Sequence, residues 1–129
     1  MLKETGFALT ITSGVIVAKE SDSILLAAEL MKKNNIGAVV VLRKDKIAGI
    51  ISERDIVHKM VCGGLSAKET KIKDVMTKKV ITADIKDGLL KIHEIMRSAS
   101  FRHLPITRDG KLIGIVSNRN LLSSFSAKK

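Results

Sequence analysis

The segment Gly49-Ile-Ile-Ser-Glu-Arg-Asp55 returns later in the chain, nearly unchanged, as Gly114-Ile-Val-Ser-Asn-Arg-Asn120. The two copies begin 65 residues apart, since 114 − 49 = 65. The same offset, without a gap, pairs Val15-Ile16 with Val80-Ile81, Met31 with Met96, and Arg43 with Arg108. A repeat of fixed period indicates that one supersecondary unit occurs twice in the chain.

Length and composition limit the class of protein. The 129 residues suit one domain, or two halves that are each too small to be stable alone. The single cysteine, Cys62, excludes an internal disulfide. The longest apolar run, residues 36–42, is far shorter than the roughly 20 residues of a membrane span, and the start of the chain lacks the apolar stretch of a signal peptide. We therefore expect a soluble, cytoplasmic protein with no membrane partner.

The charge balance favours anionic partners. The formal net charge is +10, from 23 Lys and Arg against 13 Asp and Glu. Such an excess attracts nucleotides, nucleic acid or acidic protein surfaces alike. The chain has no Trp or Tyr and only three Phe, so it offers little aromatic surface on which unpaired bases could stack. Charge alone does not choose among these partners.

Each half of the chain has the pattern strand, helix, strand, strand, helix. Short apolar runs at residues 15–18 and 80–83 predict the first strands. Helical spacing follows in two matching sets: Ile24, Ala27, Ala28 and Met31, then Leu89, Ile92, His93 and Met96. Residues 37–41 with 46–51, and 103–106 with 111–116, predict hairpins, the second around the turn signal Asp109-Gly110. A short helix is predicted to open at Ser52 and another at Ser117.

A helix between two strands predicts a right-handed crossover with locally parallel strand pairing. The fold class is therefore α/β of the α+β type, with a β-α-β-β-α unit present twice. We expect the units at residues 1–64 and 80–129, joined by a basic linker at 65–79. Five lysines stand in residues 67–79 against Glu69 and Asp74, which favours a solvated linker with one helical turn. Residues 1–13 have no counterpart that we can place.

Both seven-residue segments resemble the signature of the CBS domain, a module named after cystathionine beta-synthase. That signature is a glycine, an apolar residue, any residue, Ser or Thr, two further residues, and Asp or Asn. The similarity extends over about residues 15–125, nearly the whole chain. The resemblance implies two modules packed sheet to sheet about a pseudo-twofold axis. It also implies clefts between them that bind adenosine-containing ligands, and assembly into disk-like homodimers.

The first copy carries the residue types of a nucleotide site. Ser52 at a helix N-terminus can donate a hydrogen bond to phosphate, and Arg54 adds positive charge. Asp55 can accept two hydrogen bonds from a ribose diol, and Gly49 permits a close backbone approach. By the resemblance, an apolar slot for adenine completes a site formed by Ile16, Gly37, Ala38, Val39, Ser52, Arg54 and Asp55, with Ile16, Ala38 and Val39 as its walls.

The same spacing has a structural interpretation. Ser52 and Asp55, three residues apart, are typical of a capping box, in which the serine caps the helix and the acid bonds back to it. The two interpretations are compatible, because a cap hydroxyl can be redirected when a phosphate arrives.

The second copy departs from the first. Asn120 replaces the acid, so its contact with a ribose lacks charge assistance and should be weaker. Arg102 and His103 stand where the first copy has Gly37 and Ala38; they favour a more highly charged phosphate chain or fill the pocket, and His103 equally suits a strand-end histidine. The second expected site comprises Ile81, Thr82, Arg102, His103, Ser117, Arg119 and Asn120. The two sites should be unequal.

Catalytic and metal signals are lacking in the sequence. His58, His93, His103 and Cys62 do not have the spacing of metal ligands, and His93 lies on an apolar helical stripe typical of core or interface. There is no Walker A or Gly-x-Gly-x-x-Gly motif, and no histidine is placed to activate Ser52. We expect no catalysis, no bound metal and no required cofactor.

The sequence thus predicts a stand-alone regulatory module for energy sensing, with AMP, ADP or ATP as ligand. S-adenosylmethionine, its methylthio derivative or a dinucleotide are further candidates. The ligand would shift the angle between the modules by differential affinity, and an unknown effector protein would respond. Two alternatives remain open: a nucleic-acid-binding protein that uses its basic surface, and a purely structural dimerisation module.

Overall fold

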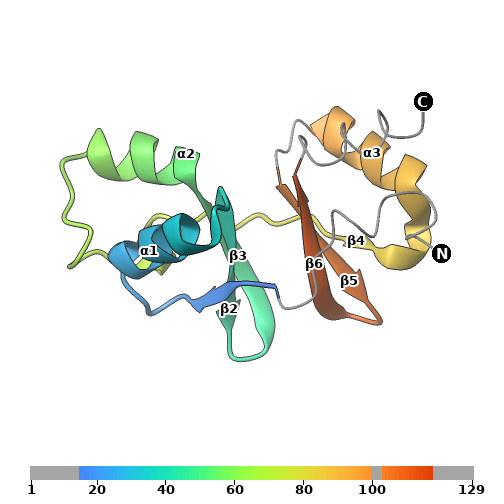
Figure 1. Ribbon diagram of the computed structural model, residues 1–129, viewed down its shortest axis with the longest axis horizontal. Coiled ribbons are helices and arrows are strands. Elements are labelled where there is room, and N and C mark those ends of the chain that lie inside the picture. The colour runs from blue at the N-terminus through green and yellow to red at the C-terminus, as the bar shows by residue number, and fades with distance from the viewer. Residues whose placement is uncertain (1–14, 100–102, 118–129) are drawn as a thin grey trace. The chain divides into compact units, whose positions relative to one another are not determined.

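The computed structural model describes residues 15–99 and 103–117, and its backbone contacts divide these into two units (Figure 1). The N-terminal unit is Ile16–Val80, and the C-terminal unit is described from Ile81 onward. Each is a three-stranded sheet with helices against it.

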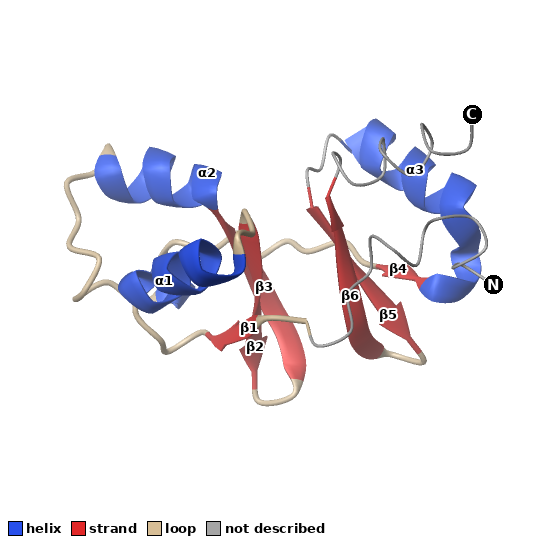
Figure 2. Cartoon of the chain, viewed as in Figure 1, coloured by secondary structure: helices blue, strands red, loops and turns tan. Residues whose placement is uncertain are grey.

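The N-terminal unit begins with β1 (Val17–Lys19), α1 (Ile24–Asn34), β2 (Ala38–Arg43) and β3 (Lys46–Ser52). One continuous helix follows, α-helical in α2 (Glu53–Asp55) and π-helical in η3 (Ile56–Val61), and a 3₁₀ turn η4 (Ile72–Asp74) comes after it. The C-terminal unit contains β4 (Ala83–Asp84), a 3₁₀ turn η5 (Ile85–Asp87), α3 (Gly88–Ala99), β5 (His103–Arg108) and β6 (Lys111–Ser117) (Figure 2).

The sheet topology confirms the predicted mixed fold. The strand orders are β1-β2-β3 and β4-β5-β6, with the first pair of each sheet parallel and the second antiparallel. β2 and β3 recur as β5 and β6 at the 65-residue offset, and the bulge at Val41/Leu42 recurs at Ile106/Thr107. The packing of one sheet on the other stays an expectation, and the helix predicted after Ser117 lies outside the described residues.

Local signals explain where α1 begins and ends. The Ser23 side chain accepts a hydrogen bond from the amide of Leu26 at 3.2 Å and caps the N-terminus. Asn35 ends the helix in the left-handed conformation, where its amide bonds to carbonyls of the last turn. The predicted apolar stripe is buried at Ile24, Ala27 and Met31 in α1, and at Leu89, Ile92 and Met96 in α3.

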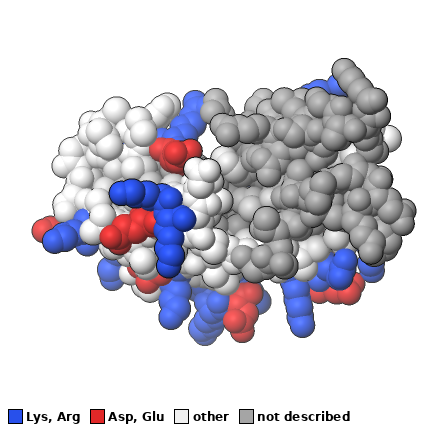
Figure 3. Space-filling model, viewed as in Figure 1, with Lys and Arg blue, Asp and Glu red and all other residues white. Residues whose placement is uncertain are grey.

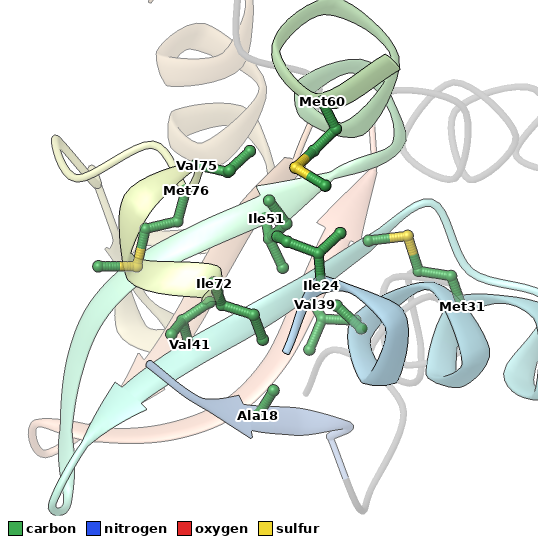
Figure 4. Packing of buried hydrophobic residues seen from close by; sticks show 11 residues of the cluster. Ala18, Ile24, Met31, Val39, Val41, Ile51, Met60, Ile72, Val75 and Met76 are labelled. Carbon is green, nitrogen blue, oxygen red and sulfur yellow. The ribbon is translucent and has the colours of Figure 1, made fainter. Parts of the chain in front are cut away.

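The core of the N-terminal unit includes part of the segment expected to be a solvated linker (Figure 4). Ile72, Val75 and Met76 are at most 5% exposed and pack with strand residues such as Val41 and Ile51. All five lysines of residues 67–79 are exposed. The expectation of a solvated linker was therefore right for the lysines but wrong for the apolar residues between them.

The β2–β3 turn contains a strained residue. Lys44 has φ +57°, whereas Asp45 does not have a positive φ. The equivalent turn in the C-terminal unit has Asp109 at φ +51° and Gly110 at φ +81°, as a two-residue hairpin turn with both central residues left-handed requires.

Substitution of Lys44 by glycine should raise the free energy of unfolding by about 1 kcal/mol, because a left-handed conformation costs an L-residue energy that glycine avoids. Urea denaturation followed by circular dichroism measures the change. Asp45→Gly is the matched control and should not stabilise the protein. Equal effects of the two variants would show that the turn strain is absent.

Candidate functional site

Asp55 is the centre of the candidate site. Among the residues that the structure describes, it is the single polar or charged one that is buried, with 8% of its surface exposed. A buried charge is costly unless it is paired and hydrogen-bonded. The partners of this carboxylate therefore decide what the site can do.

Four donors from three residues surround the Asp55 carboxylate. Oδ2 accepts hydrogen bonds from the Ser52 amide and the Ser52 hydroxyl, each at 3.1 Å. The Thr77 hydroxyl lies 3.2 Å from Oδ1 and 3.3 Å from Oδ2. Lys59 Nζ forms an ion pair with Oδ1 at 3.1 Å. Since the Ser52 hydroxyl also accepts from the Asp55 amide at 3.1 Å, the predicted capping box is confirmed.

The strand register brings the other site residues to the same place. Ser52 ends β3 opposite Ala38, the first residue of β2. The carbonyl of Gly37 accepts a hydrogen bond from the Glu53 amide at 2.9 Å, which ties the start of β2 to the start of the helix. Arg54 is exposed on the first helical turn. Gly37, Ala38, Ser52, Arg54 and Asp55 thus gather at the β3–α2 junction.

The two apolar residues expected beside adenine on β2 lie on opposite faces of the sheet. Val39 is fully buried in the core of the N-terminal unit, whereas Ala38 is on the other face because side chains alternate along a strand. Only the backbone of Val39 is therefore left for the contact that the resemblance implies. Ile16, just before β1, is half-buried against the core.

Gly49 permits a close backbone approach, and the neighbour that comes close to it is the Met76–Thr77 segment of the same chain. A Cβ atom at Gly49 would lie 2.7 Å from Met76 Sδ and 2.8 Å from the Thr77 carbonyl oxygen. Next to it, Ile50 and Thr77 exchange backbone hydrogen bonds of 3.0 and 2.9 Å. The glycine of the repeated motif thus admits the segment that carries Thr77.

Sequence reasoning missed Thr77 and Lys59. Lys59 is four residues from Asp55 on a helix, a spacing that favours an ion pair. Thr77 has a signal in the repeat itself: at the 65-residue offset it corresponds to Thr12, and Lys68-Glu69-Thr70 corresponds to Lys3-Glu4-Thr5. The repeat therefore begins earlier in the sequence than residue 15. Residues 1–14 are outside the described part of the structure.

The second expected site is described only in part. His103 opens β5 and pairs in register with Ser117 at the end of β6, as Ala38 pairs with Ser52. Ile81 and Thr82 precede β4 and are exposed. Arg102, Arg119 and Asn120 lie outside the described residues. The strand register of the first site is therefore repeated in the second.

Acidic side chains lie among the basic ones on the surface of the described residues. Arg43 donates two hydrogen bonds to the Glu20 carboxylate, and these, with the nearby charges of Lys73 and Lys78, hold the pKa of Glu20 below its ordinary value. On the face in Figure 3, the Lys and Arg side chains of the described residues are interspersed with Asp and Glu. Within residues 15–99 and 103–117, no cluster of three or more potential metal ligands occurs, and no helix is long and apolar enough to cross a membrane.

Comparisons of the sequence and of the fold with known proteins all lead to the same domain family. The family model of the CBS domain matches residues 8–62 and 72–127. The CBS domain-containing protein CBSX3, mitochondrial, of Arabidopsis thaliana is 33% identical over 133 residues, covering 90% of this chain and 65% of the relative. The solved CBS domain protein NE2398 is 30% identical, with a TM-score of 0.85 over 99% of this chain and 98% of that one.

A further solved structure carries ligands. The CBS domain pair of protein MJ0100, solved in complex with 5′-methylthioadenosine and S-adenosyl-L-methionine, is 25% identical. Its TM-score is 0.82, over 93% of this chain and 94% of that one. This chain spans between 56% and 66% of the length of the first three curated relatives it matches.

The sequence repeat and the structural units have different boundaries. The second family match begins at residue 72, but the N-terminal unit extends to Val80. Residues 72–80 therefore belong to the second repeat by sequence and to the first unit by packing.

Proposed function

Because the chain belongs to the CBS-domain family and carries two copies of the domain, we propose that it is a regulatory module that binds an adenosine-containing ligand at the Ser52–Asp55 segment. The observation that carries the proposal is the Asp55 carboxylate, held by the capping box where the first repeat's signature joins strand to helix. The ligand complex of the MJ0100 pair supports the choice of adenosine compounds.

The chemistry of the junction fits the two ends of a nucleoside phosphate. Asp55 supplies an acceptor for the ribose diol. Of the first helical amides, those of Glu53 and Asp55 already bond to Gly37 and Ser52, so a phosphate contact depends chiefly on Arg54. An adenosine compound with little negative charge would therefore bind here nearly as well as AMP. Candidate ligands are AMP, ADP, ATP, S-adenosylmethionine and 5′-methylthioadenosine.

The ligand would act as a regulator and would require no chemistry from the chain. An effector protein would respond to the conformational change that the ligand causes. The functional assembly would be a homodimer. Asn120 would make the second site the weaker of the two. No further cofactor is needed for this role.

Two measurements on purified protein test the proposal. The chain lacks Trp and Tyr and has only three Phe, so a strong absorption band at 260 nm would come from a co-purified nucleotide or nucleic acid, which mass spectrometry after denaturation would identify. Equilibrium dialysis with AMP, ATP, S-adenosylmethionine and 5′-methylthioadenosine, with GMP as control, should show saturable binding of at least one adenosine compound and weaker binding of GMP. Equal binding of GMP, or saturable binding of none, would contradict the proposal.

A second candidate function rests on the five exposed lysines of residues 67–79 and the +10 charge. A nucleic-acid-binding protein would bind duplex DNA with an affinity that falls steeply as salt rises, because counterions are released. The adenosine proposal instead predicts that binding of 5′-methylthioadenosine, which has no phosphate, depends little on salt. Titrating both probes at two salt concentrations separates the two functions.

A further inference from the structure

The lone pairs of the Asp55 carboxylate are already in use. A carboxylate offers about four lone-pair positions to hydrogen-bond donors. Four donors of the chain surround this one: the Ser52 amide, the Ser52 hydroxyl, the Thr77 hydroxyl and the Lys59 ammonium. A ribose hydroxyl can therefore bond to Asp55 only by displacing one of them.

The geometry favours displacement of Thr77. The two Ser52 donors belong to the capping box three residues away, and the Lys59 bond, at 3.1 Å, is charge-assisted. Thr77 makes the longest contacts, 3.2 and 3.3 Å, with one proton shared between two oxygens. It is also the one of these partners that comes from outside the β3-to-helix segment, since 22 residues separate it from Asp55.

Thr77 lies in residues 75–80, which lead from the core of the N-terminal unit toward β4 of the C-terminal unit. Backbone bonds to Ile50 and the burial of Val75 and Met76 hold this segment on the N-terminal unit, and Lys59 also donates to the Val75 carbonyl at 3.0 Å. Six residues after Thr77 the chain enters β4 at Ala83. A change at Thr77 therefore acts directly on the connection to the C-terminal unit.

We propose that the Asp55 carboxylate and the Thr77 hydroxyl form a latch that ligand binding opens. This inference rests on the proposed function, and it assigns the regulatory output of that site to residues 75–80. The ligand and Thr77 compete for one carboxylate, so ligand binding loosens the segment, and loosening the segment strengthens ligand binding by the same factor.

Thr77→Val tests the latch, because it removes the hydroxyl and keeps the branched shape. Wild type and variant are titrated with AMP, ATP, S-adenosylmethionine and 5′-methylthioadenosine. The variant should bind its ligand roughly two- to tenfold more tightly than wild type, as expected for one competing hydrogen bond removed. Thr77→Ser should retain wild-type affinity, and Thr70→Val, seven residues earlier and outside residues 75–80, should change nothing.

Hydrogen exchange supplies the second measurement. The Thr77 amide bonds to the Ile50 carbonyl at 2.9 Å, and its exchange should become faster in the Thr77→Val variant without ligand and in ligand-saturated wild type. If none of the four compounds binds wild type, the proposed function fails and the latch with it. If wild type binds but Thr77→Val binds equally or less tightly, or if ligand slows exchange at Thr77, the latch alone is refuted.

Discussion

Replacing Ile72 with alanine is expected to lower the free energy of unfolding by about 2–5 kcal/mol, the range for removing a large aliphatic side chain from a packed core. Ile72 has none of its surface exposed and belongs to the core cluster of the N-terminal unit. Its amide also bonds to the Asp22 carbonyl at 2.8 Å, which holds η4 beside the start of α1. Urea denaturation of the full chain measures the loss.

The adjacent Lys73→Ala variant is the matched control for Ile72→Ala. Lys73 is exposed, so its truncation should change the unfolding free energy by no more than about 0.5 kcal/mol. A small effect of Ile72→Ala, comparable with that of Lys73→Ala, would show that residues 65–79 are a solvated linker after all and would remove the basis for anchoring Thr77.

Substitution of Asp55 by asparagine should weaken binding of the adenosine ligand about fivefold. A charge-assisted hydrogen bond contributes about 1 kcal/mol more than a neutral one, and the change makes the first site resemble the second, where Asn120 stands. The variant should still fold, because the cap bond from the Asp55 amide to the Ser52 hydroxyl does not use the carboxylate and the lost partner Lys59 is half-exposed. Titration calorimetry of the adenosine compound that binds wild type measures the affinity.

The reverse change, Asn120→Asp, is the matched control for the exchange of acid and amide. It should strengthen binding at the second site, whereas Asn120→Ala should cost less affinity overall than Asp55→Ala. Equal losses in the two alanine variants, or no loss in either, would show that the ribose contact is not where we place it.

The sequence predicted the parts of the fold that depend on local pattern. β2, β3, β5 and β6 lie within two residues of their predicted spans, because apolar runs and turn residues bound them. The capping residue Ser52 was identifiable from its three-residue spacing to Asp55. β4 was shifted from the predicted 80–83 to Ala83–Asp84, since a two-residue strand is fixed by its partner rather than by its own composition.

The features that the sequence did not predict depend on long-range contacts. Ile72, Val75 and Met76 stand among lysines, so their sequence shows no clear apolar pattern. They are buried because the backbone of this segment bonds to Asp22 and Ile50 and holds them against the core. In the site, Ser52 and Asp55 were found because they are three residues apart. Thr77 was missed because its contact with Asp55 spans 22 residues and no local rule connects the two.

An amide NMR titration of the isotope-labelled chain with AMP, ATP, S-adenosylmethionine and 5′-methylthioadenosine tests the central claim most directly. If an adenosine compound binds at the first repeat, saturable shifts should concentrate on the amides of Gly37, Ala38, Ser52, Glu53 and Asp55, which the structure brings together. Thr77 should shift with them. Saturation with no shifts at these amides, or no binding by any of the four compounds, would contradict the account.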